Sequence, residues 1–259
     1  MPRIRTIIPG VDKKLLIKDA AELMPDPTRR WFLHGASLGA LTLLTGCDII
    51  DGDTAEGLLR KISAFNDGVQ AWLFNPNTLA PEYPESRITR PFPFNGYYLE
   101  SDAPEVDGAT YKLEVGGLID NKEPWTLERL YTLPQVSQIT RHVCVEGWSA
   151  IGSWQGVRLS EFLKRLGADT RAKYVWFQCA DKDGYNSPLD MRTALHPQTQ
   201  MAFKFADEIL PRAYGFPMKI RIPTKLGFKN PKYITAIYVQ NNDAGGYWEN
   251  QGYNWFSGL

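Results

Sequence analysis

The amino-acid sequence predicts an α+β protein in which β-strands dominate. Several short segments are rich in aromatic and β-branched residues, and some alternate apolar with polar side chains, as half-buried strands do. Helical segments do not alternate regularly with these strands, which argues against a doubly wound parallel sheet. The 22 glycines and 18 prolines among 259 residues indicate many turns, and 43% hydrophobic residues is enough to bury a core. We therefore expect one compact, strand-rich domain.

Local residue patterns place the individual elements. Strands are expected at residues 111–115, 173–179, 218–222 and 233–240, and short helices at 54–65, 126–133, 160–166 and 190–195. Ser160 and Asp190 are expected to cap the last two helices, because their side-chain oxygens can accept hydrogen bonds from free backbone N–H groups. Gly167 suits the end of a helix. Residues 80–94 contain four prolines, so we expect an extended segment that lies over the main domain.

The charge balance combines two unlike parts of the chain. The 29 basic residues equal the 29 acidic ones, and this balance argues against a nucleic-acid partner, which requires a basic excess. Residues 1–46 alone contain seven basic and four acidic residues, so this segment carries +3 and the remainder carries −3. The three cysteines are too few for a disulfide scaffold. We therefore treat the N-terminal segment separately from the fold.

The first 46 residues have the pattern of an export signal. Arg29 and Arg30 precede the uncharged stretch 35–46, which is shorter than the roughly 20 residues of a membrane-spanning helix. The arginine pair resembles the twin-arginine export signal. Residues 44–47 (LTGC) resemble a lipobox, in which Cys47 would be acylated, and Asp48 resembles an inner-membrane retention signal. The alternative is an ordinary amphipathic helix with a chance arginine pair.

These features divide the chain into three expected parts. Residues 1–46 form the signal segment, 47–93 an N-terminal extension, and 94–259 the catalytic or binding domain. If the signal is used, the mature protein is periplasmic and is anchored to the inner membrane through a lipid on Cys47.

The segment 141–149 (RHVCVEGWS) contains the most distinctive chemistry. Cys144 follows Arg141 and His142, an environment that is expected to lower the thiol pKa and favour a thiolate. No second cysteine lies at CxxC spacing, which argues against a structural zinc site. From these residues alone, Cys144 is a metal ligand, a Cys–His nucleophile or a buried core thiol, and the three interpretations remain open.

Residues 141–156 (RHVCVEGWSAIGSWQG) resemble the molybdenum-ligand segment of the sulfite-oxidase-fold molybdopterin oxidoreductases. The resemblance is greatest to bacterial members related to the periplasmic methionine sulfoxide reductase catalytic subunit. It continues through residues 156–159 and 215–232 and covers about 94–238. It implies the sulfite oxidase molybdopterin-binding fold, a molybdopterin cofactor, and molybdenum bound by the Cys144 thiolate.

The same resemblance implies the other site residues. Tyr185 follows a turn and either reaches the substrate side of the metal or lies in a surface turn. His142 contacts the pterin or a loop carbonyl. Basic side chains would bind the cofactor phosphate. The implied cofactor-binding residues are Asn95, Tyr98, Leu99, Arg141, His142, Cys179, Lys219, Arg221, Lys229 and Lys232. The chain departs from the family pattern in two places, with Cys179 where a threonine is usual and Lys219 where an arginine is usual.

The implied activity is two-electron oxygen-atom transfer to or from a small molecule, with reduction of a sulfoxide-type substrate preferred. Electrons would come from a membrane haem protein, because the chain has no cysteine set for an iron–sulfur cluster and no visible haem-attachment motif. Sulfite oxidation on the same cofactor is the first alternative and would need arginines that converge on the metal. The second is a non-enzymatic lipoprotein scaffold with a Cys144–Cys179 disulfide.

Overall fold

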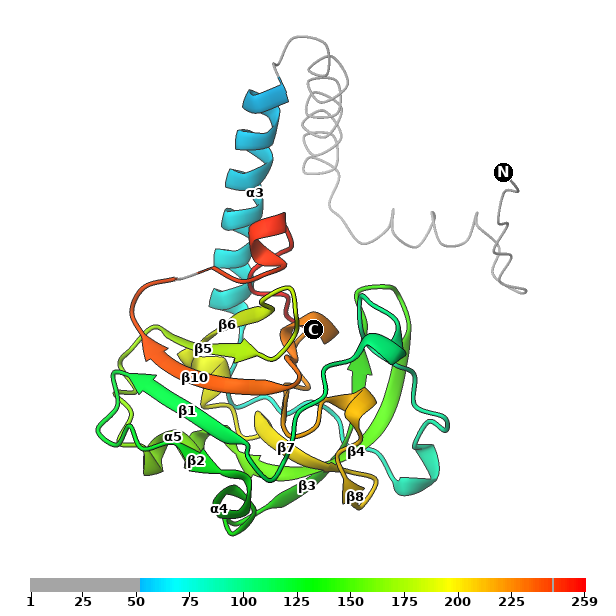
Figure 1. Cartoon of the computed structure of the whole chain (residues 1–259). Coiled ribbons are helices and arrows are strands. Elements are labelled where there is room, and N and C mark those ends of the chain that lie inside the picture. The colour runs from blue at the N-terminus through cyan, green and yellow to red at the C-terminus, as the bar shows by residue number, and fades with distance from the viewer. Residues whose placement is uncertain (1–51, 244) are drawn as a thin grey trace, which may run out of the picture. The chain divides into compact units, whose positions relative to one another are not determined.

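The computed structural model describes residues 52–243 and 245–259 (Figure 1). The expected signal segment 1–46 and Cys47 lie outside the described residues. The chain divides into two units, Met1–Leu59 and Arg60–Leu259, and the second contains both β-sheets. Helix accounts for 24% of the structure and strand for 29%, which confirms the expected α+β class with more strand than helix.

The first sheet contains three of the expected strands. Its order is β2-β1-β10-β5-β6, and β1 runs parallel to β10 while the other neighbours are antiparallel. Figure 1 shows β1, β10, β5 and β6 in succession across this sheet. The strands are β1 (Lys112–Gly117), β2 (Trp125–Thr126), β5 (Tyr174–Cys179), β6 (Asn186–Asp190) and β10 (Ile234–Gln240). The alternating burial of β5 agrees with the pattern from which it was predicted.

The second sheet was largely missed by sequence analysis. Its order is β3-β4-β7-β8, with β9 paired to β7. The strands are β3 (Val136–Val143), β4 (Ser149–Arg158), β7 (Gln200–Phe205), β8 (Glu208–Ile209) and β9 (Lys219–Arg221). The buried positions of β4 include Ala150, Gly152 and Gly156. Because these residues are small, the strand lacks the apolar alternation that identifies a half-buried strand.

The helices occur where expected, except that the first continues to Leu73, eight residues beyond its expected end at Phe65, and one cap prediction is wrong. The α-helices are α3 (Gly52–Leu73), α4 (Leu127–Tyr131), α5 (Leu159–Arg165) and α6 (Met191–Ala194). The 3-10 turns are Glu85–Arg87, Glu100–Asp102, Arg212–Tyr214, Gly227–Lys229 and Glu249–Gln251.

Of the two expected helix caps, Asp190 is confirmed and Ser160 is wrong. The Asp190 carboxylate accepts a hydrogen bond from the Thr193 backbone N–H at 2.8 Å, as expected. Ser160 is not a cap, because α5 already includes Leu159, which is fully buried and donates its N–H to Thr199. Gly167 ends the helical segment at a φ of +64°, which glycine adopts without the penalty of a side chain.

A single large hydrophobic core joins the two sheets. It contains residues of β1, β5 and β10 from the first sheet, and residues of β4, β7 and β9 from the second. Phe162 of α5 lies fully buried within the same cluster. This shared core fixes both sheets in one unit, so residues at the ends of strands from either sheet can form a common site.

The proline-rich segment lies along the second sheet, as expected. The Tyr83 N–H donates to the Ile139 carbonyl of β3, and the Thr89 N–H donates to the Ile151 carbonyl of β4, both at 2.9 Å. These bonds attach the segment to the sheet, but it is not extended throughout as expected, because residues 85–87 form a 3-10 turn. The segment therefore places Asn95 next to Cys144, the residue that directly follows β3.

We expect Gly156→Ala to destabilise the fold. A β-carbon at this position would overlap the Met201 carbonyl oxygen of β7, where the register of β4 and β7 also shifts. The expected loss is about 1–3 kcal/mol in the free energy of unfolding, measured by urea denaturation followed by circular dichroism. Gly68→Ala in α3 is the matched control, because a β-carbon there would meet no atom within 4 Å, and it should gain about 0.5–1 kcal/mol. Equal stability of both variants would contradict the close approach of β4 to β7.

Candidate active site

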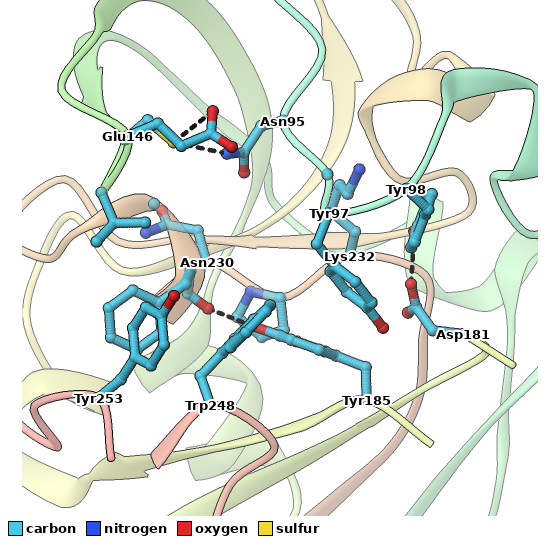
Figure 2. Close-up of a pocket in the computed structure, with 16 residues that line it drawn as sticks. Asn95, Tyr97, Tyr98, Glu146, Asp181, Tyr185, Asn230, Lys232, Trp248 and Tyr253 are labelled. Atoms are coloured by element: carbon cyan, nitrogen blue, oxygen red, sulfur yellow. Dashed lines mark hydrogen bonds between the residues drawn. The ribbon is translucent and has the colours of Figure 1, made fainter. Parts of the chain in front are cut away.

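A cavity opens where the two sheets meet the C-terminal segment. It has about 720 Å³ of space including its open mouth. Figure 2 shows Asn95 and Glu146 at one end of this space and Trp248, Tyr253 and Tyr185 at the other. The lining residues come from the segment after residue 94, the β3–β4 loop, the β5–β6 loop, the β9–β10 connection and the C-terminal segment. Segments far apart in the sequence therefore share one cavity.

Cys144 lies in the tight loop that joins β3 to β4. Its N–H donates to the Trp148 carbonyl at 2.9 Å, and its carbonyl accepts from the Gly147 N–H at 3.2 Å. Gly147 has a φ of +92°, a conformation that suits glycine. The Asn95 amide Nδ2 lies 3.4 Å from the Cys144 Sγ, and a Glu146 carboxylate oxygen lies 3.7 Å from it. The loop thus presents one buried sulfur to the cavity.

The expectation of a lowered Cys144 pKa is wrong for the protein without a bound group. Burial raises the pKa of the Cys144 thiol, and the Glu146 carboxylate raises it further. The Asn95 amide and a backbone hydrogen bond oppose this shift. Arg141 does not assist, because its side chain is exposed and lines a different cavity. A positive charge bound at the sulfur, such as a metal ion, would favour the thiolate.

His142 is fully buried, and neither of its ring nitrogens has a hydrogen-bond partner among the described residues. The ring lies between Phe92 and Trp148, and a β-carbon added to Gly227 would be only 2.7 Å from Nε2. The His142 pKa is lowered by burial and by the nearby cations Lys219, Arg221 and Lys232, so the imidazole is neutral at neutral pH. No loop carbonyl accepts from it, so two buried polar atoms remain free to bind a ligand.

Lys219 and Arg221 of β9, together with Lys232, form a buried group of positive charges. Burial lowers the Lys219 pKa, and Lys232 and Arg221 lower it further. Burial also lowers the pKa of Arg221 to about 9 and that of Lys232 to about 8. Among the described carboxylates, none forms an ion pair with Lys219 or Arg221. Uncompensated buried cations are costly, so this group fits an anionic ligand.

Each of these cations is held in a defined position. The Arg221 guanidinium donates to the Asn230 side chain at 2.8 Å and to the Arg141 carbonyl at 2.6 Å, while its Nε has no described partner. Lys219 lies 5.0 Å from the Trp154 ring centroid, and Lys232 lies 4.4 Å from that of Phe94. Lys219 also interacts electrostatically with Cys144.

Four residues expected at the cofactor site lie elsewhere. Lys229 is buried but donates to Glu249 at 2.5 Å and to the Pro188 carbonyl at 2.6 Å, so its charge is already neutralised. Leu99 is 72% exposed, and Arg141 is exposed as described above. Cys179 lies within the hydrophobic core, and burial raises its pKa well above the usual thiol value. Both Cys144 and Cys179 are free thiols, so the structure contains no disulfide between them.

Asn95, Tyr98, Tyr185 and Lys232 do line the cavity, as expected. The Tyr98 hydroxyl donates to Asp181 at 2.5 Å, and the Tyr185 hydroxyl donates to the Phe228 carbonyl at 2.5 Å. Tyr185 thus reaches the cavity with its ring, and its hydroxyl is engaged by the protein. Burial raises the pKa of Tyr185 well above the usual tyrosine value, so the hydroxyl stays protonated.

Sequence analysis missed the aromatic wall of the cavity. This wall consists of Tyr97, Trp248 and Tyr253. The Trp248 ring contacts the other two, with centroid separations of 5.3 Å from Tyr97 and 4.8 Å from Tyr253. The concentration of aromatic residues after Gly246 was the available signal. No local pattern connects that segment to Tyr97, because Tyr97 and Trp248 lie far apart in the sequence.

The described residues contain neither a preformed metal-binding cluster nor a membrane-spanning helix. Within residues 52–243 and 245–259, no cluster of three or more His, Cys, Asp or Glu side chains is arranged to hold a metal ion. No helix in the same ranges combines the length and apolar character needed to cross a membrane.

Comparisons with known proteins identify the family of the chain. Residues 100–248 match the family model described as the oxidoreductase molybdopterin binding domain. A protein of Azospira oryzae with the provisional name protein-methionine-sulfoxide reductase subunit YedZ1 is 56% identical over 257 residues, 98% of this chain and 97% of that protein. The protein-methionine-sulfoxide reductase catalytic subunit MsrP of Ralstonia nicotianae is 32% identical over 197 residues, 64% of this chain and 58% of that protein.

A solved structure shares the fold. The sulfane dehydrogenase SoxCD from Paracoccus pantotrophus has a TM-score of 0.51 and 20% sequence identity, covering 54% of this chain and 40% of that chain. The expected fold, enzyme class and cofactor are therefore confirmed. The chain belongs to the oxidoreductase molybdopterin-binding domain family, and it is an enzyme that uses molybdopterin with molybdenum.

Proposed function

We propose that this oxidoreductase reduces a sulfoxide to the thioether at a molybdenum centre bound by Cys144. The overall reaction consumes two electrons and two protons and releases one water for each sulfoxide. Two relatives are named as methionine sulfoxide reductase subunits, which supports a substrate of this class. The observation that carries the proposal is the chemistry of the cavity wall beside Cys144, which suits a neutral, partly apolar substrate.

The charges at the cavity favour a neutral substrate over an anion. Glu146 lies next to Cys144, and Asp181 lines the same cavity. Lys232 is the one basic side chain among the residues that line it, and Asp181 interacts with it electrostatically. Arg141, the arginine that sulfite oxidation would require nearby, lines another cavity. A sulfite anion would therefore meet carboxylates without converging arginines, whereas a sulfoxide carries no net charge.

The aromatic wall supplies the apolar part of the site. Tyr97, Trp248 and Tyr253 offer ring faces and edges to the cavity. Thioether and related sulfur groups make favourable contacts with aromatic rings, worth about 0.3–1.5 kcal/mol each. These rings would hold the carbon substituents of a sulfoxide and exclude water from the reacting oxygen. Tyrosine and tryptophan also carry a polar group, which can orient the polar S=O group.

The residues around Cys144 fit the cofactor. When bound, the cofactor supplies a metal that exchanges two electrons and accepts an oxygen atom. Cys144 would provide one protein sulfur to that metal, and the Asn95 amide would hold the sulfur in place. The free nitrogens of His142 would face the pterin, and Lys219, Arg221 and Lys232 would bind the phosphate.

We also propose that the enzyme acts in the periplasm on the inner membrane. The arginine pair and lipobox of residues 29–47 support export and acylation at Cys47. A membrane haem protein would supply the electrons. The word subunit in the name of the Azospira relative supports the existence of a partner protein.

A paired substrate assay tests the direction of the reaction. The purified holoenzyme is given methionine sulfoxide with a reduced viologen dye, and sulfite with ferricyanide. We expect turnover in the first assay and a rate at least tenfold lower in the second, because the cavity lacks the arginines that would bind sulfite. Turnover confined to the ferricyanide assay would replace the proposal with sulfite oxidation.

Cys144→Ser tests the metal ligand. A serine oxygen is a harder ligand than a thiolate, so we expect activity to fall by at least about a hundredfold. The matched control is Cys179→Ser, which replaces a cysteine buried in the hydrophobic core and should retain the metal spectrum, with lower stability. Molybdenum content and the sulfur-to-metal absorption band are measured for both. An unchanged absorption band in Cys144→Ser would exclude this residue as the ligand.

Lys219→Met tests the buried positive group. Loss of one charge-assisted contact, worth about 1.5–3 kcal/mol, should weaken cofactor retention by more than tenfold. Retention is measured as pterin fluorescence after release from the desalted protein, which does not depend on activity. Lys219→Arg should restore retention, and Lys225→Met, an equally buried lysine bonded to the Phe256 carbonyl, should leave it unchanged. Full retention in Lys219→Met would remove this residue from the cofactor site.

A further inference from the structure

Helix α3 has its polar side toward the domain and its apolar side exposed. The Asp67 carboxylate accepts hydrogen bonds from the Trp255 and Phe256 backbone N–H groups at 3.2 and 2.7 Å. The Gln70 side chain accepts from the Gly258 N–H at 3.2 Å, and Arg192 donates to the Ala71 carbonyl at 3.0 Å. These polar contacts determine which side of the helix faces the C-terminal segment. This is the reverse of a soluble amphipathic helix, which packs its apolar stripe on the core.

The opposite side of α3 is largely apolar, and we call it the α3 face. At 3.6 residues per turn, six of its seven members span an unbroken arc of roughly 100°, and the seventh, Leu59, lies just beyond Asn66. Phe65 is 71% exposed and Trp72 is 79% exposed. The α3 face consists of Leu58, Leu59, Ile62, Phe65, Val69, Trp72 and Leu73, all of them exposed. Soluble proteins rarely expose a contiguous apolar surface of this kind unless another surface covers it.

The arc of the α3 face is wider than a coiled-coil seam. Two facing helices need apolar residues only at alternating spacings of three and four, which makes a narrow stripe. Leu58, Ile62, Phe65, Val69 and Trp72 form such a stripe, whereas Leu73 on one flank and Leu59 beyond Asn66 add apolar surface outside it. Large aromatic residues on such a face are typical of helices that lie in the interface of a bilayer, with their apolar side in the acyl region.

The position of α3 in the sequence indicates which surface covers it. Cys47, the acylation site of the proposed lipid anchor, lies five residues before the first residue of α3. Five residues of chain span at most roughly 18 Å, so acylation at Cys47 would keep the start of α3 close to the membrane. Lys61 is exposed and borders the α3 face, where its stem can lie along apolar surface and its ammonium can reach lipid phosphates.

We propose that the α3 face lies in the outer leaflet surface of the inner membrane. The helix then acts as a second, non-covalent attachment beside the Cys47 lipid. Because α3 is hydrogen-bonded to the C-terminal segment through Asp67 and Gln70, membrane contact also limits the orientations of the catalytic domain. Trp255 and Phe256 follow soon after Trp248 and Tyr253 of the cavity, so the same C-terminal segment connects the attached helix with the aromatic wall.

A polarity-sensitive label on α3 tests this inference. Single cysteines are introduced as Phe65→Cys and Trp72→Cys on the α3 face, and as Ala64→Cys on the other side of the same helix and Ile209→Cys on β8. All four positions are exposed. Each full-length holoenzyme is labelled with a nitrobenzoxadiazole probe and mixed with vesicles of phosphatidylethanolamine and phosphatidylglycerol. The parent chain, whose Cys144 and Cys179 are buried, provides the background.

We expect addition of vesicles to raise the probe emission severalfold at positions 65 and 72, and spin-labelled lipid to quench it there. The emission at positions 64 and 209 should stay unchanged. No response at 65 and 72 would overturn the inference. An equal response at position 64 would also overturn it. So would a response at position 65 that appears without vesicles as the protein concentration rises, because it would indicate that a second copy of this chain covers the α3 face. Because this readout uses no substrate, it is independent of the sulfoxide assay, and mass spectrometry of Cys47 tests the anchor separately.

Discussion

The buried positive charge on and near β9 is the constraint on which the site depends. Arg221 and Lys232 lie close enough to Lys219 to lower its pKa, and none of the described carboxylates pairs with Lys219 or Arg221. The protein tolerates these charges because its core and hydrogen bonds stabilise the fold by more than their burial costs. An anionic cofactor bound there, as we propose, would remove that cost. Part of the stability of the holoenzyme would then be supplied by the group that it binds.

The topology of the second sheet brings this charge to the sulfur. β3 ends at the loop of Cys144, and β9 pairs with β7 of the same sheet. Arg221 connects the two strands directly, since its guanidinium donates to the Arg141 carbonyl of β3. The Cys144 loop and the cation group are consequently parts of one hydrogen-bonded unit. Trp248 and Tyr253 of the aromatic wall belong to the C-terminal segment, outside this unit.

Local patterns predicted three strands of the first sheet and the positions of the helices but missed much of the second sheet. β5 and β10 have alternating or largely apolar residues that are recognisable in isolation. In β4, several of the buried positions are alanine or glycine. Gly156 is buried because β7 approaches its backbone closely. In β7, Gln200 is fully buried although it is polar. Such strands are stabilised by their neighbours, and hydrophobic periodicity does not report that stabilisation.

The sequence by itself determined the fold class, the importance of Cys144 and the residue types available for an anionic cofactor. Only the tertiary structure decided which of those residues meet. Lys219, Arg221 and Lys232 converge near Cys144, whereas Lys229 pairs with Glu249 and Arg141 turns away. Burial raises the Cys144 pKa where neighbours in the sequence had suggested a lower one. The physical reason is that electrostatic and packing energies depend on distance and burial in space, and neighbours in sequence determine only the local part of both.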